Sequence, residues 1–373
     1  MRQDGEARCL TGRTQFPADP LIKKILVTGG AGFIGSWVVR HLVKQYAAYH
    51  VVCFDHLEYC ASRNNVDMLE GLPNFSFVHG DICKPGDVTL ALRTHQIDTI
   101  LHFAAYSHVD LSFGNSYAFT HTNVYGTHVL LECAKAAAIR KFIHVSTDEV
   151  YGEVKDDTPD LRETALLSPT NPYAATKAAA EMLVNAYQKS FKLPAIIIRS
   201  NNVYGPHQFP EKVIPKFICL LKRHRSMPLH GNGTNKRPYL YAADTTDAID
   251  TVLHKGVIGQ TYNIASTDEV ANVDLCSKLA EIFDVPVADF VTYTKDRPFN
   301  DHRYAIDSAK LEQLGWRQNT SFEEGLQRTV EWYREFGEVW WGKIDGILSA
   351  FPVIKAGQFE VVLSDMNGYD GSS

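Results

Sequence analysis

The chain has 373 residues, of which 45% are hydrophobic and 21% are charged, an ordinary globular balance that excludes wholesale disorder. The formal net charge of -6 at pH 7 gives no electrostatic footprint for nucleic acid or an anionic membrane, so we expect neither as a partner. Seven cysteines are scattered singly without a Cys-x-x-Cys spacing, which indicates reduced thiols and a cytoplasmic location. No apolar stretch is long enough to cross a bilayer, and the start of the chain lacks the apolar core of a signal peptide.

From Lys23 onward, apolar strand-like runs alternate with helical stretches. The run "KILVT" is followed by the helix-like "FIGSWVVRHLVKQY", and the later strand-like runs are "HVVCFD", "FSFVHGD", "IDTILHFAA", "KFIHVST" and "AIIIRS". Continuous apolar strands that alternate with helices are typical of a parallel sheet buried on both faces. The sequence therefore predicts an α/β fold, a doubly wound parallel sheet of the Rossmann type.

After Ser200 the composition changes to long polar loops rich in Asn, Pro, Gly and Arg, which in a compact enzyme usually form binding surface. We expect these loops to belong to a smaller C-terminal substrate-binding lobe. The predicted division has a flexible extension at 1–20 and a cofactor-binding domain at 21–200 and 239–266. It places the lobe at 201–238 and 267–353, followed by a tail at 354–373.

Two helical segments carry small and apolar residues on more than one face. They are "SYAFTHTNVYGTHVLLECAKAAA" and "PYAATKAAAEMLVNAYQKS". A helix that covers only a sheet needs one apolar stripe, so these helices are either deeply buried or pack on a partner subunit. The second interpretation, which we slightly favour, predicts a homodimer formed through a helix bundle.

The turn "VTGGAGFIGS" follows the first strand and opens a helix, with Gly29, Gly32 and Gly35 at three-residue spacing. Small residues let the backbone approach a pyrophosphate, and the amides and dipole of the helix offset its charge. Asp55 ends the next strand, where a carboxylate accepts hydrogen bonds from a ribose and repels a 2′-phosphate, so we expect NAD rather than NADP. The alternative is a tight turn that holds no ligand.

The other predicted cofactor contacts lie beside this turn or after the following strands. Asp81 and Ile82 would flank the adenine, although a strand-end aspartate caps a helix as often as it binds. Ala104 and Ala105 would let the cofactor lie close to the sheet. The predicted pocket is completed by Phe33, Ile34, Tyr106, Tyr173 and Lys177.

A second group of chemically active residue types follows the fifth strand. Tyr173 and Lys177 lie four residues apart on one helix face, where an ammonium can lower the pKa of the phenol. The strand "HVSTDEVYGE" ends on Thr147, Asp148 and Glu149. Two adjacent acids there are either a solvated turn or a working acid and base, because neighbouring carboxylates separate their pKa values.

These features together resemble the extended short-chain dehydrogenase/reductase family, which uses a Tyr-x-x-x-Lys with a Ser or Thr. Within it, the chain is similar to the nucleoside-diphosphoglucose 4,6-dehydratases. The resemblance covers nearly the whole chain from Lys23 and is carried in order by "HFAAYSHVDLS", "STDEVYG", "PTNPYAATKA", "NNVYGPHQFPEKVIPKFI" and "DRPFNDHRY". The residues of these blocks most resemble those of the plant and fungal enzymes that act on UDP-glucose.

The resemblance implies a lyase with tightly bound NAD that converts UDP-glucose to its 4-keto-6-deoxy form, a step toward rhamnose-type sugars. It implies that Tyr173 removes the proton of the 4-hydroxyl, that Asp148 is the general acid and Glu149 the general base, and that Thr147 binds the oxygen on carbon 4. The same reaction on dTDP-glucose is the nearest alternative. A nucleotide-sugar 4-epimerase has no use for the acid pair, and a non-catalytic NAD sensor would not need Tyr173 and Lys177.

The resemblance also implies residues that hold the nucleotide sugar. Phosphates need cations and amide donors. The predicted set is His108, Asn202, Lys212, Arg237, Asn272 and Arg297, each of which could instead be an ordinary surface residue. Asp110 either lines the sugar pocket with His108 or caps a helix. The histidines are not spaced as metal ligands, so we expect no metal.

Overall fold

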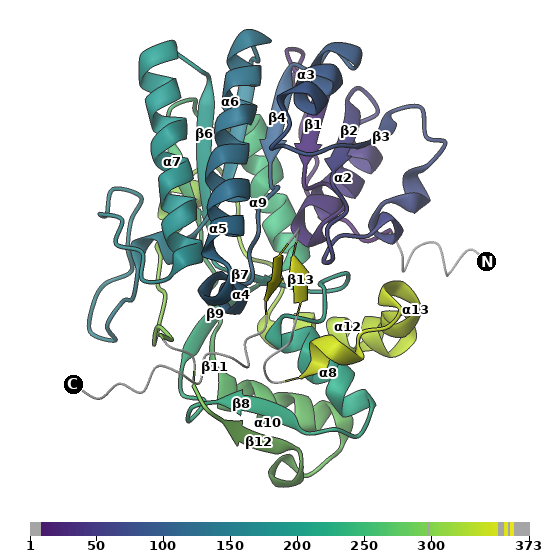
Figure 1. Cartoon of the computed structure of the whole chain (residues 1–373), viewed down its shortest axis with the longest axis vertical. Helices are drawn as coiled ribbons and strands as arrows, with labels where there is room; N and C mark the ends of the chain where they lie inside the picture. Colours follow the sequence, from purple (N-terminus) through teal and green to yellow (C-terminus); the bar gives the residue numbers. More distant parts are fainter. Residues whose placement is uncertain (1–8, 297–298, 350–353, 357–358, 362–373) are drawn as a thin grey trace.

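The computed structural model describes residues 9–296, 299–349, 354–356 and 359–361. A large parallel sheet with helices on both faces lies above a smaller lobe (Figure 1). The sheet has seven strands in the order β10-β6-β5-β4-β1-β2-β3. Their bounds are β1 Lys24–Thr28, β2 His50–Asp55, β3 Phe75–His79, β4 Thr99–His102, β5 Lys141–Thr147, β6 Ala195–Ser200 and β10 Thr261–Ile264.

Six of the seven strands form where the sequence predicts them, because their runs are apolar and, except in the half-buried edge strand β3, largely buried, whereas β10 lies outside the predicted runs. Ile25, Leu26 and Val27 of β1 have no exposed surface, and β6 is buried along its whole length. Such burial removes roughly 25 cal/mol of unfavourable hydration per Å² of apolar surface. The predicted Rossmann-type α/β fold is confirmed.

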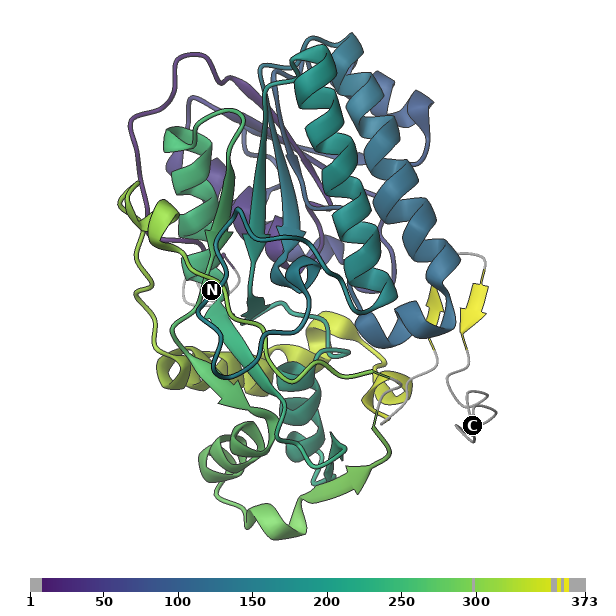
Figure 2. The ribbon, with the colours of Figure 1, turned by 90° about the vertical axis from the view of Figure 1, so that its left-hand side faces the viewer.

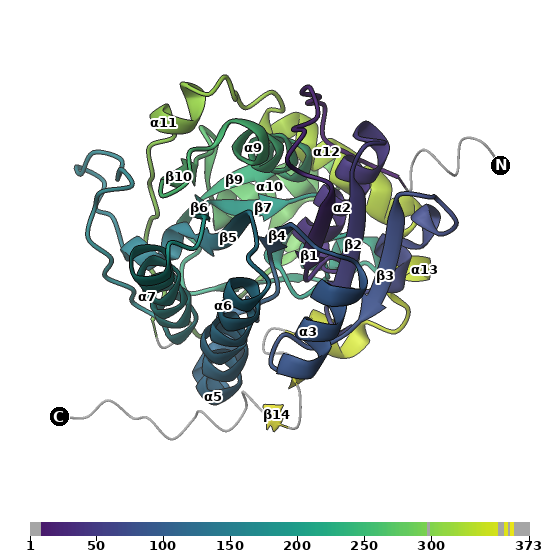
Figure 3. The same ribbon diagram turned by 90° about the horizontal axis from the view of Figure 1, so that it is seen from above.

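Two helical layers cover the sheet (Figure 3). Helices α2 (Phe33–Gln45) and α9 (Ala242–Lys255) pack together on one face. Helices α3 (Pro85–Thr94), α6 (Thr127–Ala136) and α7 (Pro172–Phe191) cover the other face, with α6 between its two neighbours. Within the part of the chain that the structure describes, no helix combines the length and apolarity that crossing a lipid bilayer requires.

The helical segment predicted around residues 116–138 is interrupted by a π-helical turn. Helix α5 (Ser116–Phe119) leads into η3 (Thr120–Gly126), which continues as α6. π-Helical turns are rare in proteins, and those that occur often lie at functional sites. Asn123 in η3 accepts from the amide of Tyr106 at 2.8 Å and donates to its carbonyl at 3.0 Å. It also donates to the Thr176 hydroxyl on α7, so the turn ties the loop after β4 to α7.

The lobe is built from short strands and helices that converge below the sheet (Figure 2). Strands β7 (Asn202–Tyr204), β9 (Lys236–Tyr241) and β11 (Glu269–Ala271) form one sheet, and β8 (Met227–His230) pairs with β12 (Val291–Thr294). The polar stretches predicted as loops thus contain strands. Helices α8 (Val213–Lys222), α10 (Asn272–Phe283), α12 (Phe322–Glu335) and α13 (Gly337–Trp341) enclose an apolar core with them.

The remaining elements are short. They are α4 (Val109–Gly114), α11 (Ala309–Glu312), and the 3-10 helices η1 (Arg63–Asn65), η2 (Asp67–Leu69), η4 (Asp148–Tyr151), η5 (Val287–Asp289) and η6 (Asp345–Leu348). Inside the predicted tail, β13 (Ile354–Ala356) pairs with β14 (Phe359–Val361) in an antiparallel hairpin.

The predicted division assigns residues 267–353 to the lobe. In the structure, part of this segment packs in the large domain instead. Leu311 and Trp316 lie in the core of the large domain, packed with residues of α2 and α9. The Trp316 indole donates to the carbonyl of Asp244 at 3.0 Å. The chain therefore crosses back to the large domain before it forms α12.

Residues 9–20, which the sequence predicts as part of a flexible extension, lie along α2 and α9. Asp247 accepts hydrogen bonds from the backbone amides of Arg13 and Thr14 at 2.6 and 2.8 Å. The hydroxyls of Tyr46 and Tyr49 accept from the amides of Phe16 and Asp19 at 2.9 and 2.6 Å. The backbone amides of this segment donate hydrogen bonds to buried side chains, and these bonds fix the segment on the domain. The composition of the segment gives no sign of such contacts.

The turn between β1 and α2 depends on glycines. Gly29 has φ +67°, and a Cβ there would lie 2.7 Å from the amide nitrogen of Ala104. A Cβ on Gly35 would overlap the carbonyl oxygen of Gly29. Side chains at these positions would push the first helix turn away from the sheet.

We expect Gly35→Ala to lower the free energy of unfolding by about 1–3 kcal/mol, because the overlap involves backbone that cannot move aside. Gly86→Ala is the matched control, since a Cβ there meets nothing within 4 Å and the residue lies in α3. That change should be neutral or stabilise by up to about 1 kcal/mol. Thermal unfolding of both variants measures the difference, and equal melting temperatures would contradict this account of the turn.

Candidate active site

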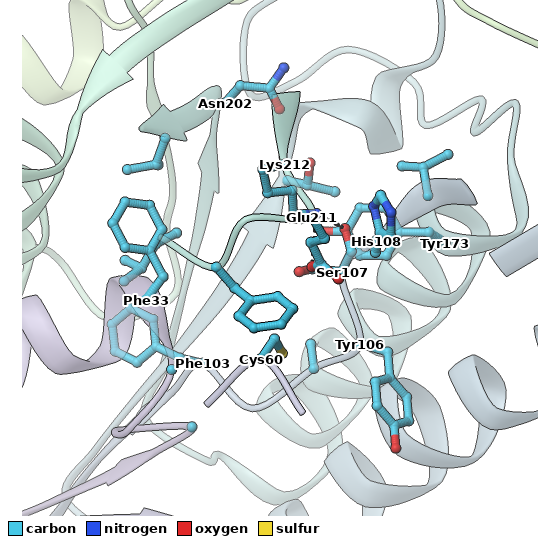
Figure 4. A pocket seen from close by; sticks show the side chains of 18 of the residues that line it. Phe33, Cys60, Phe103, Tyr106, Ser107, His108, Tyr173, Asn202, Glu211 and Lys212 are labelled. Atoms are coloured by element: carbon cyan, nitrogen blue, oxygen red, sulfur yellow. Dashed lines mark hydrogen bonds and ion pairs between the residues drawn. The ribbon is translucent and has the colours of Figure 1, made fainter. Parts of the chain in front are cut away.

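A cavity of about 1180 Å³ opens at the carboxyl ends of the parallel strands and continues into the lobe. Ligands of open α/β sheets bind at this edge, where loops from several strands meet. Figure 4 shows Phe33 and Phe103 on one side of the cavity and Glu211, His108 and Lys212 gathered in another part of it.

The predicted cofactor residues all line this cavity. They are Gly29, Gly32, Phe33, Ile34, Gly35, Asp55, Asp81, Ile82, Ala104, Ala105, Tyr106, Tyr173 and Lys177. The glycine turn leaves room for a pyrophosphate, because the one atom near a Cβ on Gly32 would be the Gly29 carbonyl oxygen. These residues fit a dinucleotide laid across the strand ends.

Asp55 is fixed by the backbone of the same loops. Its carboxylate accepts from the amide of Ala31 at 2.9 Å and from that of Leu57 at 2.7 Å. Burial raises the pKa of Asp55, and these amides act against that rise. Asp81 accepts from the amide of Cys83 at 2.8 Å, while Lys84 is the N-cap of α3. Asp81 therefore shapes a turn and does not cap the helix.

The acid pair is buried, which excludes the alternative of a solvated turn. Asp148 is 1% exposed and Glu149 is 7% exposed, and both lie in η4 directly after β5. Burial, followed by the charge of Glu149, raises the pKa of Asp148 to about 7. Burial also raises the pKa of Glu149. At neutral pH the pair can therefore hold one proton, as an acid and a base acting together require.

Each acid has its own hydrogen-bond donors. The side-chain amide of Asn201 donates to Asp148 at 2.6 Å, and its side-chain oxygen Oδ1 accepts from the backbone amide of Ser266 at 2.8 Å. Asn171, the N-cap of α7, donates to Glu149 at 3.0 Å. Thr147 and Glu149 line the cavity, and the carboxylate of Asp148, which lies between them in the sequence, accepts from the Thr147 hydroxyl at 3.2 Å. The sequence analysis missed Asn171 and Asn201, although Asn171 stands before a proline, as helix caps often do.

Tyr173 and Lys177 lie on the face of α7 that meets the cavity, but the expected effect on the phenol is wrong for this structure. Burial and the charge of Glu149 raise the pKa of Tyr173, and the hydrogen bond from Thr147 offsets only part of that rise. The Lys177 ammonium donates to the carbonyl of Val145 at 2.7 Å, and burial lowers its pKa to about 8. The tyrosine is therefore a phenol until more positive charge enters the site.

The predicted substrate residues also converge on the cavity. His108, Asn202, Lys212, Arg237 and Asn272 line it, whereas Arg297 lies outside the described residues.

Local contacts orient this group. The Lys212 ammonium donates to the carbonyl of Ser107 at 2.7 Å, and Arg237 donates to the carbonyl of Asp301 at 2.9 Å. Burial lowers the pKa of His108 to about 4, so this imidazole is neutral. His108 is itself the N-cap residue of α4, and Asp110 follows in the first turn.

Glu211 is a further buried acid that the sequence analysis missed. It lines the cavity with 4% of its surface exposed, and its carboxylate lies 3.9 Å from the Lys212 ammonium. Glu211 lies in the block "QFPEK", in which the sequence predicts only the neighbouring Lys212 as a site residue. Tyr304 and Asp301, from the block "DRPFNDHRY", were missed in the same way and line the cavity beside Glu149.

A dinucleotide-type fold with a Tyr-Lys pair at the strand ends is the arrangement of the short-chain dehydrogenase/reductase class of proteins. The family model described as GDP-mannose 4,6 dehydratase matches residues 26–329, so the chain belongs to this family.

Two curated relatives are similar along most of the chain. One is a trifunctional UDP-glucose 4,6-dehydratase/UDP-4-keto-6-deoxy-D-glucose 3,5-epimerase/UDP-4-keto-L-rhamnose-reductase of Arabidopsis thaliana, 51% identical over 88% of this chain and 50% of that protein. The other is the dTDP-D-glucose 4,6-dehydratase of Homo sapiens, 47% identical over 89% of this chain and 95% of that protein. The chain thus spans about half the length of the Arabidopsis relatives that it matches.

A solved structure agrees with this assignment. The dTDP-glucose 4,6-dehydratase DesIV of Streptomyces venezuelae, determined with NAD bound, superposes with a TM-score of 0.82. The two proteins are 41% identical, and the match covers 86% of this chain and 99% of DesIV.

The raised pKa of Asp148 has a consequence for stability. Its folded-state pKa of about 7 lies well above the usual pKa of an aspartate, about 3.9, so its contribution to stability is fully present below that usual pKa and is lost as the pH rises through 7. Asp148→Asn removes the charge, and we expect it to raise the melting temperature by roughly 2–4 °C at pH 8. At pH 5 the rise should be clearly smaller, because the folded protein keeps the acid neutral there and only the unfolded chain ionises it. A rise of the same size at both pH values would contradict the raised pKa.

Proposed function

We propose that this protein is an NAD-dependent nucleoside-diphosphoglucose 4,6-dehydratase, a hydro-lyase, and that its substrate is UDP-glucose. The observation that carries the proposal is the buried Asp148–Glu149 pair beside Tyr173 at the mouth of a dinucleotide fold. Elimination of water from carbons 5 and 6 of a sugar needs one acid and one base at adjacent carbons, and this pair supplies both.

Tyr173 and Thr147 act on the oxygen of carbon 4. Bound NAD would accept the hydride of carbon 4 and return it to carbon 6, and its positive ring would favour the tyrosinate that burial disfavours. Tyr173 takes the proton of the 4-hydroxyl, and the Thr147 hydroxyl orients the same oxygen. The resulting ketone acidifies the hydrogen on carbon 5.

Glu149 and Asp148 then divide the elimination between them. The Glu149 carboxylate takes the proton from carbon 5, and the electron pair of that bond forms the double bond that expels the 6-hydroxyl. Asp148, whose pKa is raised to about 7, gives its proton to that hydroxyl, which leaves as water. Glu149 returns its proton to carbon 5 when carbon 6 is reduced.

Two other functions would use fewer of the side chains in this site. A nucleotide-sugar 4-epimerase needs the Tyr-Lys pair but has no use for two buried acids, whose burial costs free energy. A non-catalytic NAD sensor has no use for Tyr173 or for the proton-holding pair. Dehydration is the activity that uses each of these groups.

The choice of UDP-glucose over dTDP-glucose is the finer part of the proposal. It is supported by the somewhat higher identity to the Arabidopsis UDP-glucose enzyme, 51% against 47% for the human dTDP-glucose enzyme. We propose that Lys212 and Arg237 bind the diphosphate, with Asn202 and Asn272 as amide donors, since all four line the lobe side of the cavity.

We also propose a homodimer that forms through α6 and α7, which lie side by side on one flank of the sheet (Figure 3). Met182 and Phe191 of α7 are each 53% exposed there, and such apolar exposure fits a partner helix. Sedimentation velocity tests this, and a monomer at micromolar concentration would contradict it. A reducing compartment such as the cytoplasm is in keeping with the free thiols of all seven cysteines.

Incubation with UDP-glucose and with dTDP-glucose separately, without added reductant, tests the reaction directly. We expect a product lighter by one water, formed faster from UDP-glucose, as measured by mass spectrometry. A mass-neutral product inverted at carbon 4 would show an epimerase instead. No conversion of either sugar by protein that still holds NAD would favour the sensor.

Glu149→Gln should separate oxidation from water loss. We expect the reduced nicotinamide to accumulate on addition of UDP-glucose, while dehydration slows by about 10²–10⁴-fold, because the general base is gone. Glu335→Gln is the control, an exposed glutamate at the end of α12. An unchanged dehydration rate in Glu149→Gln would remove the base from Glu149.

A further inference from the structure

Glu149 is held by a second group of buried residues that the proposed reaction does not use. One oxygen of its carboxylate accepts from Asn171 at 3.0 Å and lies 3.5 Å from the Tyr304 hydroxyl. That hydroxyl makes a much closer contact with a carboxylate oxygen of Asp301. Asp301 in turn accepts from the Thr170 hydroxyl, which lies 2.8 Å from each of its oxygens.

The phenol of Tyr304 thus stands between two carboxylates and has one hydrogen to give. Asp301 and Tyr304 are 2% and 4% exposed, so both are buried beside Glu149. The shorter contact places the hydrogen on the Asp301 side. Arg237 supports this arrangement, since its guanidinium lies 4.9 Å from the centre of the Tyr304 ring and donates to the Asp301 carbonyl.

We propose that Asp301 and Tyr304 are positioning residues for Glu149. Asp301 accepts the one hydrogen bond that the Tyr304 hydroxyl can donate, so Glu149 receives no second hydrogen bond beside the one from Asn171. The proposal rests on the role of Glu149 as general base. A donor bonded to a carboxylate stabilises its charged form and weakens it as a base. If the Tyr304 hydrogen turned to Glu149, the carboxylate would accept the carbon 5 proton less readily.

The arrangement also suits the proton balance of the reaction. When the bond between carbon 5 and its hydrogen breaks, the proton moves to Glu149 and the electron pair stays with the sugar. Glu149 becomes neutral, and the hydroxyl of Tyr304 keeps its hydrogen and continues to donate it to Asp301. Nothing around the base then has to reorient before the proton returns to carbon 5.

Other charges also bear on Glu149, so the hydrogen of Tyr304 must be separated from them. Burial and the charge of Asp301 raise the pKa of Glu149, while Asn171, Arg237 and Lys212 act in the opposite direction. The titratable and charged groups that face it are Asp148, Tyr173, Lys212, Arg237, Asp301 and Tyr304.

Asp301→Asn removes a charge and also releases the Tyr304 hydrogen, and both changes lower the pKa of Glu149. Tyr304→Phe removes the hydrogen alone. Made in the Tyr304→Phe background, Asp301→Asn therefore acts only through charge, and this difference separates the two effects.

The experiment titrates the Glu149 carboxyl in the substrate-free holoenzyme by infrared difference spectroscopy, with the band assigned by its loss in Glu149→Gln. We expect Asp301→Asn to lower the midpoint by more than about one pH unit in the wild-type background, since about one unit is the size expected for one gained hydrogen bond to a charged group and the lost charge adds to it. The shift should be clearly smaller in the Tyr304→Phe background. Asp289→Asn, at an exposed aspartate of η5, should shift nothing.

Equal shifts in the two backgrounds, or no shift at all, would overturn the proposal. Should Asp301→Asn fail to fold, Thr170→Val takes its place. Loss of the Thr170 donor strengthens the hold of Asp301 on the Tyr304 hydrogen, so the midpoint should stay or rise, and a fall would overturn the proposal.

A second measurement links the pair to turnover. The acidic limb of the pH profile for solvent deuterium incorporation at carbon 5 should move with the infrared midpoint in each variant. If the wild type removes water from neither sugar, the proposed function fails, while the substrate-free titration still decides whether Asp301 controls Tyr304.

Discussion

The repulsion between two adjacent carboxylates that are withdrawn from water is the constraint on which this site depends. Asp148 and Glu149 follow a buried strand directly, so neither can be hydrated as in a surface turn. The free-energy cost is reduced by amide donors, Asn201 for one acid and Asn171 for the other, and by a proton retained on the pair. That retained proton makes the site capable of elimination, because a pair of fully ionised acids would contain a base and no acid.

The partners of the two acids come from different parts of the chain, and this explains why a lobe is needed. Asn201 follows β6 of the parallel sheet and is oriented by the amide of Ser266. The groups around Glu149 include Asp301 and Tyr304, which lie on the segment that returns from the lobe. The acid pair therefore lies at the junction of the sheet and the lobe, and its protonation depends on how the two pack. A sugar bound between them would contact residues from both.

Sequence patterns predict what is local and apolar, and they miss contacts between distant segments. The bounds of β5 coincide with the predicted strand-like run "KFIHVST", and the glycine turn follows from its spacing between a strand and a helix. Asn201 and Tyr304 contact the acids across 53 and 155 residues of sequence, and an asparagine or tyrosine in a polar stretch has no local pattern that reveals such a contact. The docking of residues 9–20 was missed for the same reason, because Asp247 meets backbone amides that have no sequence signature.

The state of Tyr173 extends this electrostatic argument to the order of events. Residues four apart on a helix share a face, so the spacing with Lys177 was a sound reason to expect a low phenol pKa. Burial and the nearby acids reverse that expectation, and the Lys177 ammonium is engaged by the Val145 carbonyl. A phenol in this setting loses its proton only when positive charge arrives, and both the glycine turn and Tyr173 line the cavity. The cationic ring of a dinucleotide bound on that turn would be positive charge of the required kind, so the proposed function requires the cofactor to occupy the site before Tyr173 acts on a sugar.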